Sequence, residues 1–176
     1  LSLLEASNMA VWLVTFVLHN SRASERMERY GSFGGKPMFL EIQGRVDLAN
    51  SILDSCEHHQ ILLFELNILA DHVHLLIDAE AEQDLNNKVR IIKGRSSFQC
   101  RHSPWRTKDA PLWAQKFNRR PLRTSKDTDA AMRYVALNHF KHAGDWGELF
   151  ANENEKELRP YILRRLAELK ASVCSK

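Results

Sequence analysis

The 176-residue sequence predicts a protein of the α+β class, in which helices cover an antiparallel sheet. Short runs rich in β-branched and aromatic residues alternate with longer segments whose apolar residues recur at a helical period. Loops rich in glycine and proline separate these segments. The length favours one domain, which we place at residues 1–145, followed by a helical extension at residues 146–176.

The first half of the chain predicts three strands and one helix. Residues 11–18 are β-branched and aromatic, which predicts a strand. Residues 41–60 carry apolar side chains at a helical period and predict a helix. Residues 61–70 and 72–79 predict two strands that meet at Asp71.

The second half predicts a strand and three helices. The helices span residues 84–99, 127–141 and 160–172, and the strand spans residues 112–122. We expect Asp127 or Thr128 near the start of the second helix and Pro160 in the first turn of the third. The order of elements is that of the ferredoxin-like β-α-β-β-α-β fold with added C-terminal helices. Because many activities share this fold, the function has to be argued from particular side chains.

Composition narrows the setting of the protein. The longest apolar runs, MAVWLVTFVL and ILLFELNILA, are too short to cross a bilayer as a helix, so we expect no membrane partner. Cys56, Cys100 and Cys174 are odd in number and widely spaced, which argues against disulfides and a structural zinc site. We therefore expect a cytoplasmic protein.

Positive charge is concentrated in one segment. The net charge is only +3, but from Lys88 to Lys126 the chain has twelve Lys or Arg residues against one acid, Asp109. A short run of this kind is often just a solvated face. This long run is interleaved with aromatic residues suited to base stacking, Phe98, Trp105, Trp113 and Phe117, so a polyanionic partner is the better interpretation.

Two histidines stand one residue apart in a predicted strand. Side chains alternate along a strand, so Val73, Leu75 and Ile77 should face the core while His72 and His74 point outward together. Two imidazoles placed in this way can bind one metal ion. They could also be ordinary polar residues on a half-solvated sheet face, unless a helix brings further ligands to the same place.

The predicted helix at residues 127–141 could supply those ligands. Tyr134, Asn138 and Lys141 fall on one side of a helical projection, and the tyrosine and the amide are one turn apart. The opposite side carries the stripe that we expect to be buried, Met132, Val135, Ala136, His139 and Ala143. An asparagine in the middle of a helix is unfavourable, which suggests that Asn138 has a specific role.

A His-hydrophobic-His strand followed by a helix with Tyr-x-x-x-Asn resembles the HUH superfamily of single-strand DNA endonucleases. Within that superfamily the chain is most similar to the single-tyrosine transposases, and above all to the REP-associated tyrosine transposases. The resemblance runs over residues 11–144 and is strongest in ADHVHLLI, IIKGRSS, LWAQKF and YVALNHFKHAG. The segment FNRRPLR is more basic than the resemblance leads one to expect, and the residues after Gly144 receive no role from it.

The resemblance implies a specific chemistry. His72, His74 and Asn138 would bind Mg2+ or Mn2+, although imidazole ligands intrinsically favour softer ions. Tyr134 would attack the scissile phosphate, leaving a 5′-phosphotyrosine link and a 3′-hydroxyl. The partner would be single-stranded DNA with hairpin or palindromic repeats, contacted by the basic side chains Lys93, Arg95, Lys116, Arg119, Arg120, Arg123 and Lys141.

Other functions remain open at this level. A rolling-circle replication initiator or a relaxase would use the same chemistry, usually with additional domains. A noncatalytic single-strand-binding module would leave the histidines incidental, and a domesticated transposase would keep the site for housekeeping cleavage. The sequence is also compatible with a monomer or a homodimer, with Tyr134 acting in its own site or in a partner's.

Overall fold

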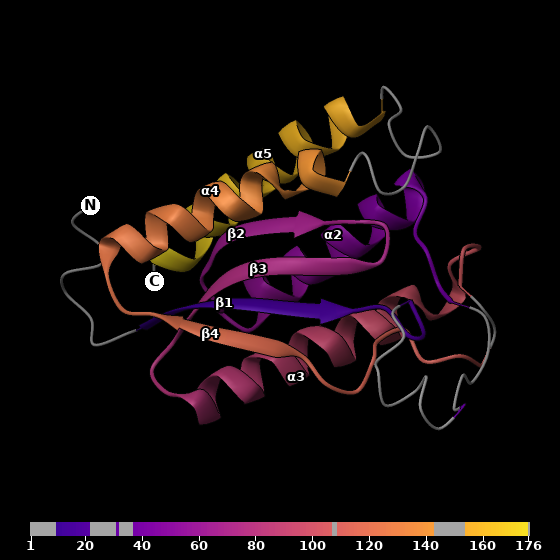
Figure 1. The fold of residues 1–176 in the computed structure, drawn as a ribbon, viewed down its shortest axis with the longest axis horizontal. Coiled ribbons are helices and arrows are strands. Elements are labelled where there is room, and N and C mark those ends of the chain that lie inside the picture. Colours follow the sequence, from indigo (N-terminus) through magenta and orange to yellow (C-terminus); the bar gives the residue numbers. More distant parts are fainter. Residues whose placement is uncertain (1–9, 22–30, 32–36, 107–108, 143–153, 176) are drawn as a thin grey trace.

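A four-stranded antiparallel sheet forms the centre of the computed structural model, which describes residues 10–21, 31, 37–106, 109–142 and 154–175 (Figure 1). The strand order is β2-β3-β1-β4. The central strands are β1 (Ala10–Val17) and β3 (His72–Ala79), and the edges are β2 (Leu63–Ile68) and β4 (Asn118–Leu122). This order confirms the predicted ferredoxin-like arrangement.

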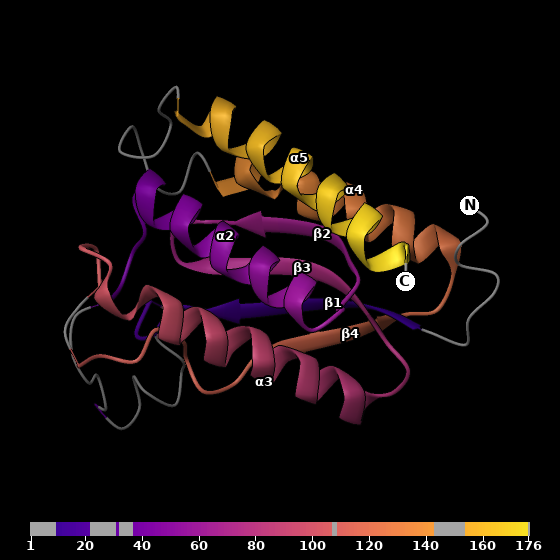
Figure 2. The same ribbon diagram turned by 180° about the vertical axis from the view of Figure 1, so that it is seen from behind.

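Helices cover both faces of the sheet. On one face lie α2 (Ile42–His58) and α3 (Glu82–Gln99), which continues into the short helix η1 (Cys100–His102) (Figure 2). On the other face α4 (Ser125–His142) runs along β2 and β3 (Figure 1). The last helix, α5 (Asn154–Cys174), packs against α2 and β2. None of the described helices is both long and apolar enough to cross a membrane.

Strand alternation divides the buried apolar residues into two clusters. Trp12, Val14 and Phe16 of β1 join the larger cluster between the sheet and helices α2, α3 and α5. The smaller cluster lies under α4 and consists of Val11, Leu76, Leu122, Ala131 and Val135. Both faces of the sheet are therefore partly buried, but far fewer apolar side chains pack on the face under α4.

The strand predicted at residues 112–122 is shorter in the structure. Regular pairing is confined to β4, and before it Trp113 forms only an isolated bridge with Leu18. Side chains from α3 hold this preceding segment: Lys93 Nζ donates hydrogen bonds to the carbonyl groups of Ala114 (2.8 Å) and Gln115 (3.2 Å). Those carbonyls are consequently bound to a side chain instead of a neighbouring strand.

The start of α4 also differs from its prediction. Thr124, directly before the helix, accepts a hydrogen bond on Oγ1 from the Asp127 N–H (3.0 Å), and Asp127 Oδ2 accepts one from the Thr124 N–H (3.2 Å). This reciprocal pair is a capping box. The helix therefore begins at Ser125 and its cap is Thr124. Asp127 lies near the cap, as predicted, whereas the Thr128 hydroxyl donates to the Thr124 carbonyl within the first turns.

The last helix is longer than predicted. It begins at Asn154, so Pro160 lies inside α5 and not in its first turn. Proline lacks the N–H that would bond to the preceding turn, which is why the sequence pattern favoured a later start. Leu158 and Ile162, on either side of Pro160, are buried in the larger cluster, and this packing stabilises the helix across the proline.

A buried ion pair fastens α5 to the sheet. The guanidinium of Arg159 donates two hydrogen bonds of 2.9 Å to the two carboxylate oxygens of Glu65 on β2, and a third of 2.8 Å to the carbonyl of Leu66. Both side chains are largely buried. A two-pronged pair of this kind fixes direction as well as distance.

Removing one partner of this pair should be strongly destabilising. Arg159→Ala leaves the Glu65 carboxylate buried without its cation, so we expect the free energy of unfolding to fall by about 3–5 kcal/mol. The double substitution Glu65→Leu with Arg159→Met should recover most of that loss. Urea denaturation followed by circular dichroism measures both. If Arg159→Ala lowers the free energy of unfolding by less than about 1 kcal/mol, the ion pair contributes no more than a solvent-exposed ion pair does.

Candidate active site

The two histidines of β3 lie on the sheet face that α4 covers. Val73, Leu75 and Ile77 belong to the larger cluster on the opposite face, so the predicted alternation is confirmed. The alternative that the histidines are polar residues on a half-solvated face is wrong, because His72 is only 1% and His74 only 5% exposed. Substituting either one therefore alters a buried environment.

Each histidine ring is held through its Nδ1 atom. His72 Nδ1–H donates to the carboxylate of Asp71, and His74 Nδ1 is hydrogen-bonded to Thr15 Oγ1 of β1 at 2.7 Å. Both rings consequently turn Nε2 to the same point, where the two atoms are 3.0 Å apart. Sequence reasoning missed both supporting residues: Asp71 was interpreted only as a turn, and no local pattern singles out Thr15.

The spacing of the two Nε2 atoms suits a shared metal ion. Two ligands about 2.1 Å from an octahedral ion and at right angles to each other are roughly 3 Å apart. The described residues contain no group of three or more His, Cys, Asp and Glu side chains that could hold an ion. A third ligand in this part of the chain would therefore have to be of another type.

Asn138 on α4 is the residue that can complete the set. The face of α4 turned to the sheet consists of Thr128, Ala131, Val135 and Asn138, all buried. The prediction that Asn138 lies on an open polar face is therefore wrong, and of the predicted buried stripe Met132 and Ala136 are only half-buried. The side chains of His139 and Lys141, and all of Ala143, lie outside the described part of the structure.

The rotation of α4 is fixed by contacts to the strand beside the histidines. Asn67 of β2 is paired in register with His74, and its Nδ2 donates a 2.7 Å hydrogen bond to the carbonyl of Val135. Both groups are buried. This bond turns the Val135 side of the helix to the sheet, and Asn138, which is three residues further on, turns with it.

The Asn138 side chain has no hydrogen-bond partner among the described residues. Its Oδ1 and Nδ2 atoms are both shielded from solvent, and the residue is 1% exposed. Buried amides are nearly always hydrogen-bonded, and one without a partner destabilises the fold. An oxygen ligand for a cation beside two imidazoles would account for this arrangement, so the residues present fit a divalent ion.

Tyr134 lies at the rim of this site. Its ring meets the His74 ring edge to face, with centroids 5.4 Å apart and an interplanar angle of 71°. Unlike Asn138, it is 41% exposed. It also borders a shallow hollow of about 290 Å³ on the flank of α4, lined by Ala130, Arg133, Tyr134, Leu137 and Asn138. Solvent can therefore reach Tyr134, which lies beside the buried histidines His72 and His74.

The two buried cysteines among the described residues are not candidate nucleophiles. Cys56 and Cys100 are both free and buried. Burial raises the pKa of Cys56 to about 12 and also raises the pKa of Cys100. Neither residue is therefore a thiolate at neutral pH.

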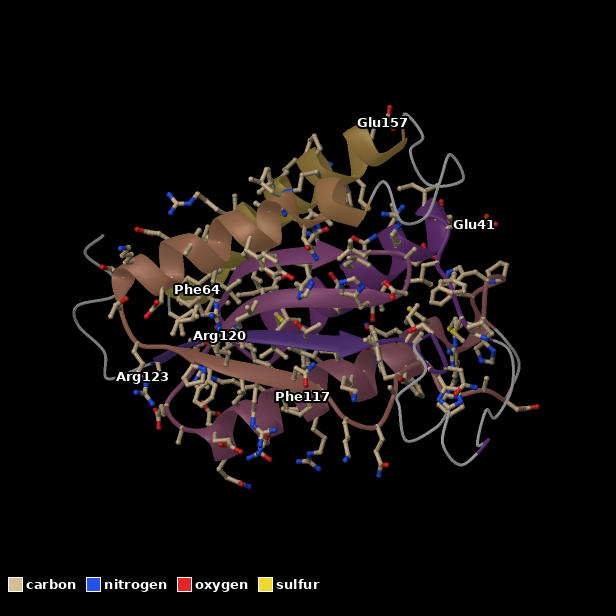
Figure 3. The ribbon with its side chains drawn as sticks, viewed as in Figure 1. Glu41, Phe64, Phe117, Arg120, Arg123 and Glu157 are labelled. Carbon is tan, nitrogen blue, oxygen red and sulfur yellow. The ribbon has the colours of Figure 1, made fainter. Side chains whose placement is uncertain are left out.

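The structure separates the predicted DNA-binding residues of β4. Arg120 is paired with Leu13 and Asn118 with Thr15, so both point to the face of the sheet that carries His74. Arg119 points to the other face, where it forms an ion pair with Glu82 of α3. Arg120 and Arg123 are exposed on the β4 side of the sheet (Figure 3).

The remaining candidates differ in their surroundings. Lys93 is tied to two backbone carbonyls, and burial lowers its pKa. Arg95 is half-buried on α3, and Lys116 is exposed before β4. The side chain of Lys141 lies outside the described part of the structure, so its predicted role is left as a prediction.

The chain is similar in sequence to a curated transposase. A protein of Haemophilus influenzae named as a REP-associated tyrosine transposase is 28% identical over 97 residues, or 50% of this chain and 54% of that protein. The chain thus spans about half the length of this curated relative.

Two solved structures resemble the fold. The structure of a REP-associated tyrosine transposase bound to a REP hairpin has a TM-score of 0.51 at 19% identity, covering 76% of this chain and 68% of that one. A transposase from Deinococcus radiodurans has a TM-score of 0.49 at 18% identity, covering 74% of this chain and 90% of that one. The first of these supports the fold alone.

A family model described as IS200-like transposase matches residues 38–138. The match covers more than half of the chain. It includes the histidine strand and reaches Asn138, so it contains His72, His74, Tyr134 and Asn138 together. The chain therefore belongs to the IS200-like transposase family.

Proposed function

We propose that this protein cleaves and rejoins single-stranded DNA through a covalent link to Tyr134. The observation that carries the proposal is the position of Tyr134 against His74, one helical turn before the buried amide of Asn138, which has no partner among the described residues. Hairpin DNA is the proposed substrate class, because a transposase of similar fold has been solved bound to a REP hairpin. Arg120 and Arg123, exposed on the β4 side of the sheet, are the proposed contacts to the DNA backbone.

The proposed reaction exchanges one ester for another. The phenolic oxygen of Tyr134 bonds to the scissile phosphorus while the bond from phosphorus to the 3′ oxygen breaks. Tyr134 gives up its phenolic proton, and the departing 3′ oxygen gains one. The phosphate is then bonded to the phenolic oxygen of Tyr134 and stays joined to the DNA through its 5′ oxygen, and attack by a 3′-hydroxyl reverses the step. Because the ester is conserved, no nucleotide cofactor is required.

In this proposal His72 Nε2, His74 Nε2 and Asn138 Oδ1 would hold a Mg2+ or Mn2+ ion. When bound, such an ion supplies positive charge that polarises the scissile phosphate. Asp71 and Thr15 keep the two Nε2 atoms directed to one point by holding the opposite side of each ring. Asn67 holds α4 over them through the Val135 carbonyl.

Substitution of the tyrosine tests the covalent step. Tyr134→Phe removes only the attacking oxygen, so the variant should keep its stability and its affinity for single-stranded DNA but form no covalent adduct. The assay is denaturing gel electrophoresis and mass spectrometry after incubation with Mn2+ and single-stranded DNA that carries a REP hairpin. Tyr161→Phe, on α5, is the matched control and should form the adduct like the wild type. An adduct on the Tyr134→Phe chain would refute the assignment.

Substitution of the amide tests the ion site without relying on activity. Asn138→Leu removes a buried polar group that has no partner among the described residues, so the metal-free protein should not be destabilised. Mn2+ should raise the unfolding temperature of the wild type. At a free Mn2+ concentration one hundred times the dissociation constant, the free energy of unfolding should rise by about 2.7 kcal/mol. The same addition should leave Asn138→Leu unchanged. Thermal unfolding with Mn2+ or with EDTA measures both effects.

Asn67→Leu is the matched control for this experiment. It makes the same chemical change on the same sheet face, but the Asn67 amide is bonded to Val135. We therefore expect it to lower the stability of the metal-free protein by about 1–3 kcal/mol. If Asn138→Leu is as destabilising as Asn67→Leu and Mn2+ still stabilises it, the amide serves the fold and not an ion.

A further inference from the structure

A second recess lies on the side of the sheet away from Tyr134. It is a groove of about 490 Å³ between α3 and the segment 111–117. One wall is a stripe of α3 that includes Arg90, Lys93 and Gly94, and the other wall includes Trp113 and Phe117. Phe117 lies on the α3 side of β4 (Figure 3). This volume is within the range of about 300–1,000 Å³ that is common for small-ligand sites.

The walls of this α3 groove are fixed to one another. Lys93 Nζ spans from α3 to the carbonyls of Ala114 and Gln115, and the Trp113 indole N–H donates a 3.0 Å hydrogen bond to Ser96 Oγ. Trp113 and Ser96 are both buried. The groove is consequently preformed, which reduces the entropy lost when something binds in it.

The lining of the groove suits an anion with an apolar part. Three cations, Arg90, Lys93 and Arg106, are among the lining residues, and none of those residues is an acid. Arg106 donates from its Nη atoms, while its buried Nε has no partner among the described residues. The exposed side chain of Arg90 has no hydrogen bond or ion pair to any described residue. The apolar wall is aromatic, and the Arg119 guanidinium lies 5.4 Å from the Phe117 ring centroid.

Gly94 is the lining residue of the groove that has no side chain. It lies in the interior of α3, where glycine is less favourable than alanine. A Cβ atom at this position would have no described neighbour within 4 Å, so no contact inside the described protein requires the glycine. A larger side chain here would instead take up space in the groove that Trp113 and Phe117 also line.

We propose that the α3 groove binds one unstacked nucleotide of the single-stranded DNA substrate. Its base would contact the aromatic wall of Trp113 and Phe117, and its phosphate would be held by Arg90 and Arg106. Aromatic contact is tolerant of sequence and is a common way of holding unpaired bases. The proposal rests on the proposed function and assigns it a second contact with the same strand, on the opposite side of the sheet from the cleavage site.

Filling the groove tests this assignment. In a Tyr134→Phe background, which prevents covalent trapping, Gly94→Leu should weaken binding of a fluorescent single-stranded oligonucleotide about tenfold or more, because it removes the space for the base. Asn87→Leu is the matched control, since it is exposed on the same helix but outside the groove, and it should bind like its parent. Arg90→Gln should weaken binding and reduce its salt dependence, because one phosphate contact is lost. Fluorescence anisotropy measures the affinities, and circular dichroism confirms that each variant is folded.

The possible results separate this proposal from the proposed function. Equal affinities for Gly94→Leu and Asn87→Leu would overturn the groove assignment, whereas the adduct assay at Tyr134 would be unaffected by that result. Equal competition by duplex DNA of the same sequence would overturn the role of an unpaired base. If sedimentation shows that the parent self-associates and Gly94→Leu does not, the groove binds a second copy of the chain and the assignment is wrong.

Discussion

The seating of α4 on the sheet is the constraint on which the rest of the site depends. The helix contributes little apolar surface to the sheet, chiefly Ala131 and Val135 against Leu76, so its rotation is set by a polar contact from Asn67 to the Val135 carbonyl. Asn67 is also the cross-strand neighbour of His74. One hydrogen bond therefore relates the helix that carries Tyr134 and Asn138 directly to the strand that carries the histidines.

Buried polar groups under α4 fall into two kinds. Those that position the site, including Asp71 and Asn67, are hydrogen-bonded, as buried polar groups generally are. Asn138 has no such partner among the described residues, although it is equally buried. A second helix adds support, because Arg159 of α5 fastens β2 at Glu65, two residues from Asn67. The energetically unfavourable burial of the Asn138 amide is thus offset by hydrogen-bonded groups around it, an arrangement often found at functional sites.

Periodicity in the sequence was sufficient to predict the order of helices and strands. It also predicted that His72 and His74 share one face of their strand, because strand alternation is a local property. It was not sufficient for the rotation of α4, since Asn138 is turned inward by a bond from Asn67, a residue far away in the chain. Alternation also puts the adjacent Arg119 and Arg120 on opposite faces of their strand, but which of them shares a face with His74 appears only when β4 is paired with β1. Thr15 could not be found either, because its role appears only when β1 and β3 are paired, whereas Asp71 stands next to His72 in the chain and was interpreted only as a turn.

The central claim is that β3 and α4 together form one cation site. Diffraction from crystals of the Mn2+-loaded protein, collected at the manganese absorption edge, tests it most directly. The account predicts a single anomalous peak bounded by His72 Nε2, His74 Nε2 and Asn138 Oδ1. A peak elsewhere, or none while the Asn138 amide is hydrogen-bonded within the protein, would contradict it.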